Sequence, residues 1–126
     1  MNKTMKISVI TPVKNLEDYI AETIESVINQ RGNFDIEYII MDGNSSDKTL
    51  DICNEYQKQI ELKTRKIFCN SIQMKVYSSP DNSMYEALAN GLKMVTGDIT
   101  AYINGDDFYL PNAFSCVAEI FEKFKK

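Results

Sequence analysis

The sequence predicts an α/β protein with a Rossmann-like parallel sheet, strand order 3-2-1-4, and helices on both faces. Short apolar runs typical of strands alternate four times with amphipathic helical segments over the 126 residues. Such an alternation produces a parallel sheet with right-handed crossovers. Three of the apolar runs also end in polar residues, as strands do where ligands bind at the carboxyl edge of an open sheet. A chain of this length predicts one domain, spanning residues 1–126.

The first half of the chain contains two strand–helix units. The first strand is predicted over residues 6–11 and ends there because Pro12 has no amide proton for a sheet ladder. A helix over residues 17–30 follows, with isoleucine and valine at helical spacing. The second strand spans residues 36–41, and polar residues 45–47 are candidate N-caps for the next helix. The apolar stripe of that helix consists of Leu50, Cys53, Tyr56 and Ile60.

The second half begins with residues 62–73, which follow no clear period. Their cations, Lys63, Arg65 and Lys66, form either a solvated surface or a phosphate contact. A short third strand is predicted over 74–78, a helix over 84–95, and a fourth strand from residue 99. Pro111 suits the first turn of a last helix. We expect the apolar row of this helix to lie in the core: Phe114, Val117, Phe121 and Phe124.

Composition excludes several classes of protein. The net charge of −4 argues against nonspecific nucleic-acid binding, which needs a basic face. The three cysteines, Cys53, Cys69 and Cys116, include no Cys-x-x-Cys pair and indicate reduced thiols in a cytoplasmic protein. No apolar run approaches the roughly 20 residues that a membrane span needs. We therefore expect a cytoplasmic location, with peripheral association at the inner face of the membrane as a further possibility.

Two adjacent carboxylates, Asp106 and Asp107, follow the fourth predicted strand in the run Asn-Gly-Asp-Asp. Adjacent like charges ionise together most easily beside a cation. The chain has no histidine, so a metal here would be held by oxygen, which suits Mg²⁺ or Mn²⁺. The alternative is an ordinary Asn-Gly turn. The predicted topology favours the metal, because the strand ends at Thr11, Asp42 and Asp106 converge on one crevice.

The ligand can be narrowed by exclusion. The chain has neither the G-x-G-x-x-G pattern of dinucleotide sites nor a P-loop pattern. Residues 42–47 match a calcium loop poorly. A pocket with two carboxylates can hold a diphosphate if a divalent cation offsets the repulsion. Asp42 then remains to accept a hydrogen bond from a base or sugar, unless it is only a turn residue.

Five short blocks carry a family resemblance. They are residues 8–15 (Ser-Val-Ile-Thr-Pro-Val-Lys-Asn), 41–49 (Met-Asp-Gly-Asn-Ser-Ser-Asp-Lys-Thr), 79–91 (Ser-Pro-Asp-Asn-Ser-Met-Tyr-Glu-Ala-Leu-Ala-Asn-Gly), 96–98 (Thr-Gly-Asp) and 104–107 (Asn-Gly-Asp-Asp). In this order they resemble the family 2 glycosyltransferases, over about residues 6–114. The resemblance implies the nucleotide-sugar-binding half of a GT-A fold. It also implies inverting sugar transfer from a nucleotide sugar, commonly a UDP-sugar, to a glycan or lipid-linked acceptor in cell-envelope polysaccharide synthesis.

The resemblance also implies roles for individual residues. Thr11, Pro12 and Asn15 would shape the nucleotide pocket, and Asp42 would accept the imino hydrogen of uracil. Asp106 and Asp107 match the acidic, DXD-like metal motif, with Asp107 as the direct ligand and Asp106 near ribose or metal. Asp81 and Tyr85 belong to the block that flanks the donor. A bound Mn²⁺ or Mg²⁺ would be the cofactor.

The sequence departs from the family pattern at several positions. Ser83 stands where the family often has glycine, Ala89 where it often has asparagine, and Leu88 where many relatives have a cation. Residues 62–73 resemble an insertion. Family members continue into an acceptor-binding half that supplies the general base, and neither Glu119 nor Glu122 matches that base. We therefore expect residues 1–126 to lack the acceptor-binding half and to transfer sugar poorly on their own.

Two other classes of function stay open from the sequence. A phosphoacceptor receiver shares the length and the parallel sheet, but it carries its acid pair after the first strand, where this chain has Thr11 and Pro12. The second alternative is a non-catalytic nucleotide-sugar-binding or interaction module related to a transferase.

Overall fold

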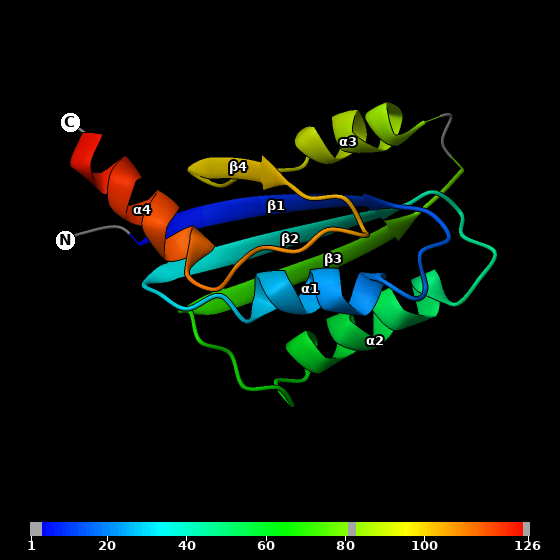
Figure 1. The fold of residues 1–126 in the computed structure, drawn as a ribbon, viewed down its shortest axis with the longest axis horizontal. Coiled ribbons are helices and arrows are strands. Elements are labelled where there is room, and N and C mark those ends of the chain that lie inside the picture. Colours follow the sequence, from blue (N-terminus) through cyan, green and yellow to red (C-terminus); the bar gives the residue numbers. More distant parts are fainter. Residues whose placement is uncertain (1–3, 81–82, 125–126) are drawn as a thin grey trace.

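The protein is built on a parallel sheet of four strands, seen in a computed structural model that describes residues 4–80 and 83–124. The strands lie in the order β3-β2-β1-β4 (Figure 1). This confirms the predicted order 3-2-1-4. Their bounds are Met5–Val13 for β1, Phe34–Asp42 for β2, Ser71–Ser78 for β3 and Ile99–Tyr102 for β4.

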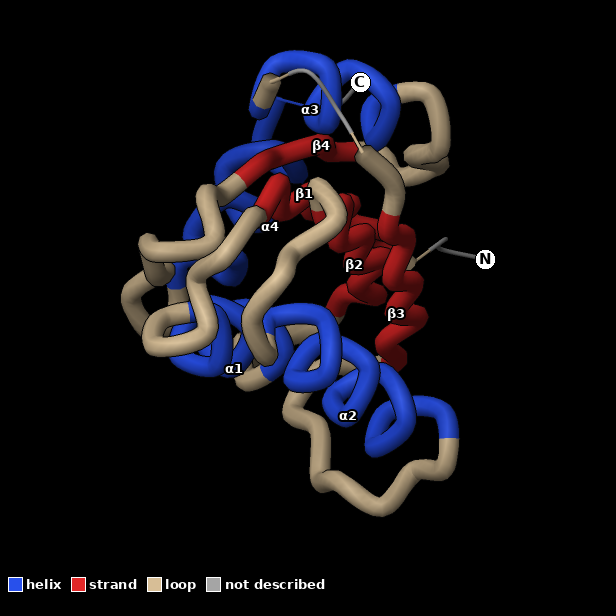
Figure 2. Tube along the Cα trace, turned by 90° about the vertical axis from the view of Figure 1, so that its right-hand side faces the viewer, coloured by secondary structure: helices blue, strands red, loops and turns tan. Residues whose placement is uncertain are grey.

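Helices cover both faces of this sheet, as predicted (Figures 1 and 2). Helices α1 (Ile20–Ile28) and α2 (Thr49–Glu61) lie side by side on one face. Helix α3 (Met84–Leu92) packs on β1 and β2 from the other face. Helix α4 (Ala113–Phe124) lies at the end of the sheet where the strands begin.

The two faces of the sheet have cores of different size. The larger core lies under α1 and α2, where alternate residues of β1 and β2 such as Val9 and Tyr38 are fully buried. The smaller core lies under α3 and is formed by Ile10, Ile39, Met41 and Ala87. Burial of apolar surface stabilises both cores by about 25 cal/mol per Å². The larger core, under α1 and α2, therefore contributes more to stability.

Strand β1 runs two residues past its predicted end and includes Pro12. The prediction was wrong because it took β1 to have ladder partners on both sides along its whole length. The carbonyl of Ile10 accepts from the amide of Ile103 on the β4 side. Pro12 therefore also directs its nitrogen to that side, beyond the last β1–β4 pair, Ile10 with Tyr102. No ladder bond is lost there, which is the edge situation in which strands tolerate proline.

Several other element bounds differ from the predictions. Strand β3 begins at Ser71 because that residue pairs with Asp35 of β2, so part of the segment 62–73 is sheet. In α2 the partly buried Ile52 takes the place expected for Leu50 in the stripe. Tertiary pairing thus extends an element that has a weak local signal.

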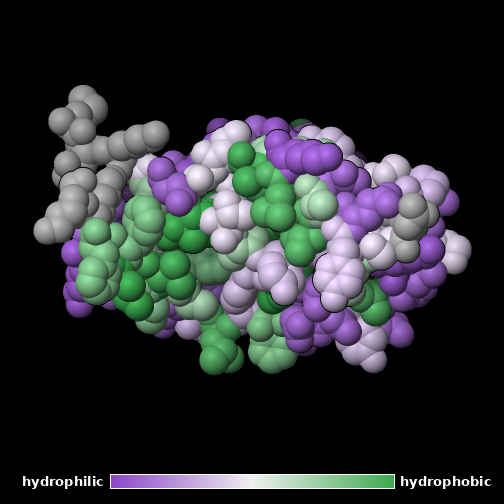
Figure 3. Space-filling model, turned by 90° about the horizontal axis from the view of Figure 1, so that it is seen from above, coloured by the Kyte–Doolittle hydropathy of each residue, from purple (hydrophilic) through white to green (hydrophobic). Residues whose placement is uncertain are grey.

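The apolar row of α4 is the main departure from the predicted core. Phe114 is buried against Phe34 and Tyr109, with ring centroids 6.0 Å and 5.0 Å away. The rest of the row was predicted wrongly, since Val117, Phe121 and Phe124 are 45%, 36% and 80% exposed. Helix α4 meets the larger core through Ala113, Phe114 and Ala118 and extends past the end of the sheet (Figure 1). Figure 3 shows hydrophobic side chains gathered on the surface at this end of the molecule. The first residue of α4 is Ala113, two positions after the proline expected to start it.

A buried carboxylate fastens β4 to the sheet at the end opposite the strand tips. Glu37 of β2 is 2% exposed and accepts from the hydroxyl of Ser8 at 2.7 Å and the amide of Thr96 at 2.8 Å. Lys6 lies 3.9 Å from its second oxygen. Burial acts to raise the pKa of Glu37, but the hydrogen bonds from Thr96 and Ser8 and the charge of Lys6 outweigh it and leave the pKa lowered.

The lowered pKa makes the contribution of Glu37 depend on pH. Because its folded pKa lies below the usual 4.5, the stabilisation is complete above the unfolded pKa and is lost as pH falls through the folded pKa. We expect Glu37→Gln to lower the free energy of unfolding near neutral pH, and this deficit to shrink as the pH drops below 4.5. Urea unfolding at a series of pH values measures it, with Glu119→Gln on exposed α4 as control. A deficit that does not change with pH would contradict the ionised assignment.

Candidate functional site

A cavity of about 330 Å³ opens at the carboxyl edge of the sheet. Three segments far apart in the sequence line it: the end of β1, the start of α3 and the loop after β4. Of the predicted site residues, the cavity is lined by Pro12 and Asp106. Asp42 and Asp107 lie at the same edge of the sheet, at the end of β2 and after β4. The strand ends therefore lie at one edge of the sheet, as predicted, but Thr11, Asp42 and Asp107 are not among the residues that line the cavity.

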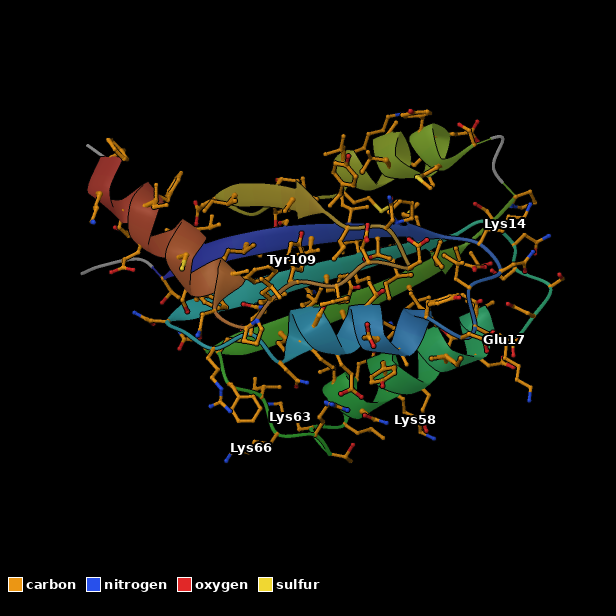
Figure 4. The ribbon with its side chains drawn as sticks, viewed as in Figure 1. Lys14, Glu17, Lys58, Lys63, Lys66 and Tyr109 are labelled. Carbon is orange, nitrogen blue, oxygen red and sulfur yellow. The ribbon has the colours of Figure 1, made fainter. Side chains whose placement is uncertain are left out.

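Lys14 and the start of α3 give this cavity a positive side. Lys14 follows β1 and lies at the same end of the molecule as Glu17 (Figure 4). No carboxylate among residues 4–80 and 83–124 forms an ion pair with it. Ser83 caps α3 by accepting from the amide of Glu86 at 3.1 Å. A cation and a helix N-terminus on one cavity wall are suited to phosphate oxygens.

Asp42 is bound within the chain rather than left open to solvent. It is 2% exposed, and its carboxylate accepts from the amide and hydroxyl of Ser45 and from the hydroxyl of Ser78, the last at 2.7 Å. These donors fix the carboxylate at the tip of β2. Its uracil contact stays a prediction, and a base would meet a carboxylate that is already oriented.

Asn15 joins the loops that follow β1 and β2. Its side-chain oxygen accepts from the amide of Ser46 at 2.8 Å, and its own amide donates to the hydroxyl of Ser45 at 2.9 Å. Its φ of 52° is left-handed, a conformation that asparagine adopts more readily than most residues. Asn15 thus holds the two loops in register beside the cavity.

The remaining residues predicted to contact the nucleotide-sugar donor differ in their surroundings. Thr11 is fully buried, and its hydroxyl is hydrogen bonded to that of Tyr38 at 2.8 Å. Its side chain therefore belongs to the sheet. Tyr85 projects from α3 and is 83% exposed, outside the cavity lining. Asp81 lies outside the described residues. The roles proposed for these three residues stay predictions.

Helix α1 holds the loop that carries Asp106 and Asp107. Thr23 is fully buried, and its hydroxyl donates to the carbonyls of Gly105 at 2.9 Å and Asp107 at 2.5 Å. Further along α1, Ser26 accepts from the amide of Tyr109 at 3.0 Å. These polar residues on one face of a helix satisfy loop backbone groups that burial would otherwise leave unpaired.

The hydrogen bonding along α1 continues to the start of α4. Gln30 is 2% exposed and donates to the carbonyl of Leu110 while accepting from the amide of Phe114, both at 3.0 Å. The segment from Gly105 to Phe114 is therefore held at its backbone by Thr23 and Ser26 of α1 and by Gln30, which follows the end of α1. Sequence analysis missed this role of Thr23, Ser26 and Gln30, although their spacing of three and four residues on one helix was visible.

Asp106 and Asp107 are the residues that could hold a divalent cation at this cavity. Asp106 and Asp107 are exposed, and no described donor binds their carboxylates. No group of three or more histidine, cysteine or acidic side chains that could hold a metal occurs among the residues the structure describes. The protein can thus offer two carboxylates, which matches Mg²⁺ or Mn²⁺ held by one or two acids together with phosphate and water.

Asn104 is a further residue that sequence analysis did not single out. It lines the cavity beside Asp106, and its side-chain oxygen is buried with no hydrogen-bond partner in the described part of the chain. A buried acceptor without a donor costs about 1–3 kcal/mol. A ligand hydroxyl or a water molecule at the cavity would satisfy it. Lys14 was likewise missed, although it stands inside the block at residues 8–15.

The cysteines take no part in the site. Burial raises the pKa of the Cys53 thiol to about 12 and that of Cys69 to about 11. Both side chains are therefore protonated at neutral pH and act as neither thiolate nucleophiles nor metal ligands. Leu88 packs with Met94 and Val95 on the smaller core, so the position that carries a cation in many relatives contributes to packing here.

Comparison with known proteins identifies the class to which this fold and site belong. The family model described as Glycosyl transferase family 2 matches residues 8–126. The chain belongs to glycosyltransferase family 2. This agrees with the resemblance seen in the five sequence blocks, and the receiver alternative is not retained.

Individual relatives show the same similarity. The chain is 33% identical over 120 residues to the minor teichoic acid biosynthesis protein GgaB of Bacillus subtilis (strain 168), covering 94% of this chain and 12% of that protein. It is 31% identical over 123 residues to the dolichyl N-acetyl-alpha-D-glucosaminyl phosphate 3-beta-D-2,3-diacetamido-2,3-dideoxy-beta-D-glucuronosyltransferase of Methanococcus voltae, covering 95% of this chain and 35% of that protein. The chain therefore spans about a third or less of these relatives.

A solved structure confirms the fold. The structure of Staphylococcus aureus TarS 1-349 in complex with UDP-GlcNAc matches with a TM-score of 0.78 at 24% sequence identity. The match covers 94% of this chain and 32% of that chain.

Removing the hydroxyl of Thr23 tests how the acidic loop is held. Thr23→Val keeps the shape of the side chain but leaves the carbonyls of Gly105 and Asp107 without their donor. We expect the free energy of unfolding to fall by about 1–3 kcal/mol, measured by urea denaturation. Thr100→Val, at an exposed position of β4, is the matched control and should change it by less than about 0.5 kcal/mol. Equal effects of the two substitutions would show that the α1 contacts do not stabilise the loop.

Proposed function

We propose that this chain forms the donor-binding part of a glycosyltransferase that uses a nucleotide diphosphate sugar, most simply a UDP-sugar. The observation that carries the proposal is the 330 Å³ cavity, which brings Lys14, the N-terminus of α3 and Asp106 together at the carboxyl edge of the sheet. Family membership supports the reaction class, and the TarS structure with UDP-GlcNAc supports the choice of donor. The reaction would be an inverting transfer.

Different residues around the cavity would contact different parts of the nucleotide-sugar donor. Asp42, held by Ser45 and Ser78, would accept the imino hydrogen of uracil. Pro12 would form the wall between base and phosphate, and Asn104 would accept from a ribose hydroxyl. Lys14 would contact the diphosphate. Binding on preformed hydrogen-bonding groups avoids the cost of ordering loops when the donor arrives.

Asp106 and Asp107 would hold the divalent metal, Mn²⁺ or Mg²⁺. When bound, the metal would neutralise charge that develops on the departing diphosphate. Asp107 would be the direct ligand, and Asp106, which lines the cavity, would lie between metal and ribose. The contacts from Thr23 hold the backbone carbonyls of Gly105 and Asp107, on either side of Asp106, without using the carboxylates.

The acceptor side of the reaction is a second part of the proposal. GgaB is named for teichoic acid biosynthesis, and the Methanococcus voltae relative for a dolichyl-linked sugar phosphate. We infer a glycan or lipid-linked acceptor in cell-envelope polysaccharide synthesis, reached from the cytoplasmic side. In the described residues, no helix is both long and apolar enough to cross a membrane.

A second candidate is a nucleotide-sugar-binding module without catalysis. Inverting transfer needs a general base within hydrogen-bond reach of the acceptor hydroxyl, and this chain spans about a third or less of the relatives described above. Glu119 and Glu122 lie on exposed α4, at the opposite end of the sheet from the cavity. Donor binding is expected in either case. Acceptor-dependent release of UDP by the chain would distinguish the transferase from the binding module.

Calorimetric titration with UDP tests the metal site. We expect UDP to bind more tightly with Mn²⁺ or Mg²⁺ than with chelator, and more tightly than ADP or GDP. Asp107→Ala should weaken the metal-dependent binding by at least about tenfold, because a charge-assisted contact contributes about 1.5–3 kcal/mol. Asp106→Ala should have a smaller effect.

The matched control for this titration is Glu119→Ala, which removes an acid far from the cavity and should leave the affinity unchanged. Equal UDP affinity with metal and with chelator would refute the metal assignment. Binding of all three nucleotides with one affinity would refute the assignment of Asp42 to the base.

Lys14→Gln tests the positive wall of the cavity. Because Lys14 is exposed, its contact with a diphosphate is partly screened, and we expect UDP binding to weaken by about two- to fivefold at moderate salt. Uridine, which has no phosphate, should bind the variant and the parent equally. Lys48→Gln, at the N-terminal end of α2, is the control. If uridine and UDP lose affinity equally, Lys14 does not contact phosphate.

A further inference from the structure

A cationic surface occupies the C-terminal end of α2 and the loop that follows it. Residues 58–66 contain four cations and one acid, whereas the rest of the chain carries ten cations and seventeen acids. Lys58, Lys63 and Lys66 are all exposed and lie along the lower side of the molecule in Figure 4, where Lys58 stands between Lys63 and Glu17 and Lys14 is at the far corner. We call Lys58, Lys63 and Lys66 the α2 cationic surface. The molecule is thus strongly polarised despite its net charge of −4.

The charges of this surface are not neutralised within the described chain. Arg65 is engaged, because it pairs with Glu25 at 3.2 Å and contacts Gln59 at 3.2 Å. The three lysines form no ion pair among residues 4–80 and 83–124. The one acid of the segment, Glu61, accepts from Gln57. All three lysines are therefore exposed and without an ion pair in this part of the chain, and the ammonium of Lys66 lies 5.5 Å from the ring centroid of Phe68.

Lys63 adopts a backbone conformation that is unfavourable for lysine. Its amide donates to Ile60 and the next amide, of Thr64, donates to Gln59, which together form a Schellman motif at the end of α2. Lys63 occupies the left-handed position of this motif, with φ of 55°. Glycine is the favoured residue there because it has no Cβ. A lysine at this position lowers stability but adds a cation beside the other two.

Apolar groups accompany the lysines. Leu62, next to Lys63, is 61% exposed. Beside it, a cavity of about 250 Å³ has Ile60, Ile67 and Ile72 among its lining and Lys63 and Arg65 at the same opening. An exposed leucine and an apolar cavity beside cations are suited to a binding partner whose surface is anionic outside and apolar beneath.

We propose that the α2 cationic surface docks on an anionic phospholipid membrane, with Leu62 entering the interface. Each lysine near such a surface strengthens binding by about fivefold, which corresponds to about 1 kcal/mol. The acidic remainder of the molecule is repelled, so the attraction also orients the chain with α2 toward the lipid. The donor site, at the carboxyl edge of the sheet, stays open to solvent in this orientation.

An anionic lipid suits this surface better than a soluble phosphate or a nucleic acid does. A soluble phosphate would not use Leu62, because contact with an apolar side chain gives it nothing. A nucleic acid would meet only three cations on a chain of net charge −4, too few to overcome its repulsion by the acidic remainder. Both ligands remain as outcomes of the experiment below.

Sedimentation with vesicles tests the proposal on the full chain. Vesicles of equal parts phosphatidylglycerol and phosphatidylcholine are compared with vesicles of phosphatidylcholine alone. We expect binding to the anionic vesicles only, weakened by high salt. The triple variant Lys58→Gln, Lys63→Gly, Lys66→Gln should reduce it by about a hundredfold. The control triple Lys75→Gln, Lys93→Gln, Lys123→Gln loses the same charge elsewhere and should bind as the parent does.

Two single variants distinguish an effect on membrane docking from an effect on folding stability. Lys63→Gly should weaken vesicle binding by about fivefold while leaving the urea midpoint unchanged or higher, because glycine suits the backbone there. Leu62→Ser should weaken vesicle binding, because it removes the apolar side chain that enters the interface. Equal losses in the two triple variants, no binding to anionic vesicles, or competition by glycerol phosphate or a DNA oligonucleotide at equal phosphate concentration would each overturn the proposal.

Discussion

The burial of β1 between β2 and β4 is the constraint on which the rest of the structure depends. A strand with neighbours on both edges and helices on both faces cannot leave a polar group unpaired without a cost of about 1–3 kcal/mol. Ser8 meets this demand through Glu37 and the amide of Gly97, and Thr11 through Tyr38. These partners fix the start of β4 on one face and the position of β2 on the other. The tip of β1, free of β4 beyond Ile10, is then available for the cavity.

The strand order and the edge at which the site lies were predictable because both follow from rules of chain connectivity. Alternating strands and helices require right-handed crossovers, and these bring the polar strand ends to one edge. Asp42 and Asp106 could therefore be placed near one another without knowledge of any contact. The same reasoning placed Pro12 at this edge, where it lines the cavity, but wrongly placed it outside the strand. A sequence shows that proline lacks a donor, but it does not show that β4 ends before the donor is needed.

The features that could not be predicted depend on contacts between distant segments. Thr23 and Gln30 look in the sequence like ordinary polar residues of an amphipathic helix, yet they bind the backbone of the loop at residues 105–114. The row on α4 has the spacing of a core helix, but the sheet ends under its first turn, so only Phe114 is covered. Helical periodicity reports which residues share a face and not whether another element is present to cover that face.

The acidic residues at the carboxyl edge of the sheet differ in how many hydrogen bonds their carboxylates accept from the rest of the chain. Asp42 is buried and receives three hydrogen bonds, from Ser45 and Ser78, so its charge is balanced before any ligand arrives. The carboxylates of Asp106 and Asp107 receive none from the described residues, although Thr23 binds the backbone carbonyls of Gly105 and Asp107 on either side of Asp106. Helix α1 thus fixes the backbone of the acidic loop, while both carboxylates stay exposed to solvent. If the loop binds a cation as proposed, this fixed backbone avoids the cost of ordering the loop when the cation arrives.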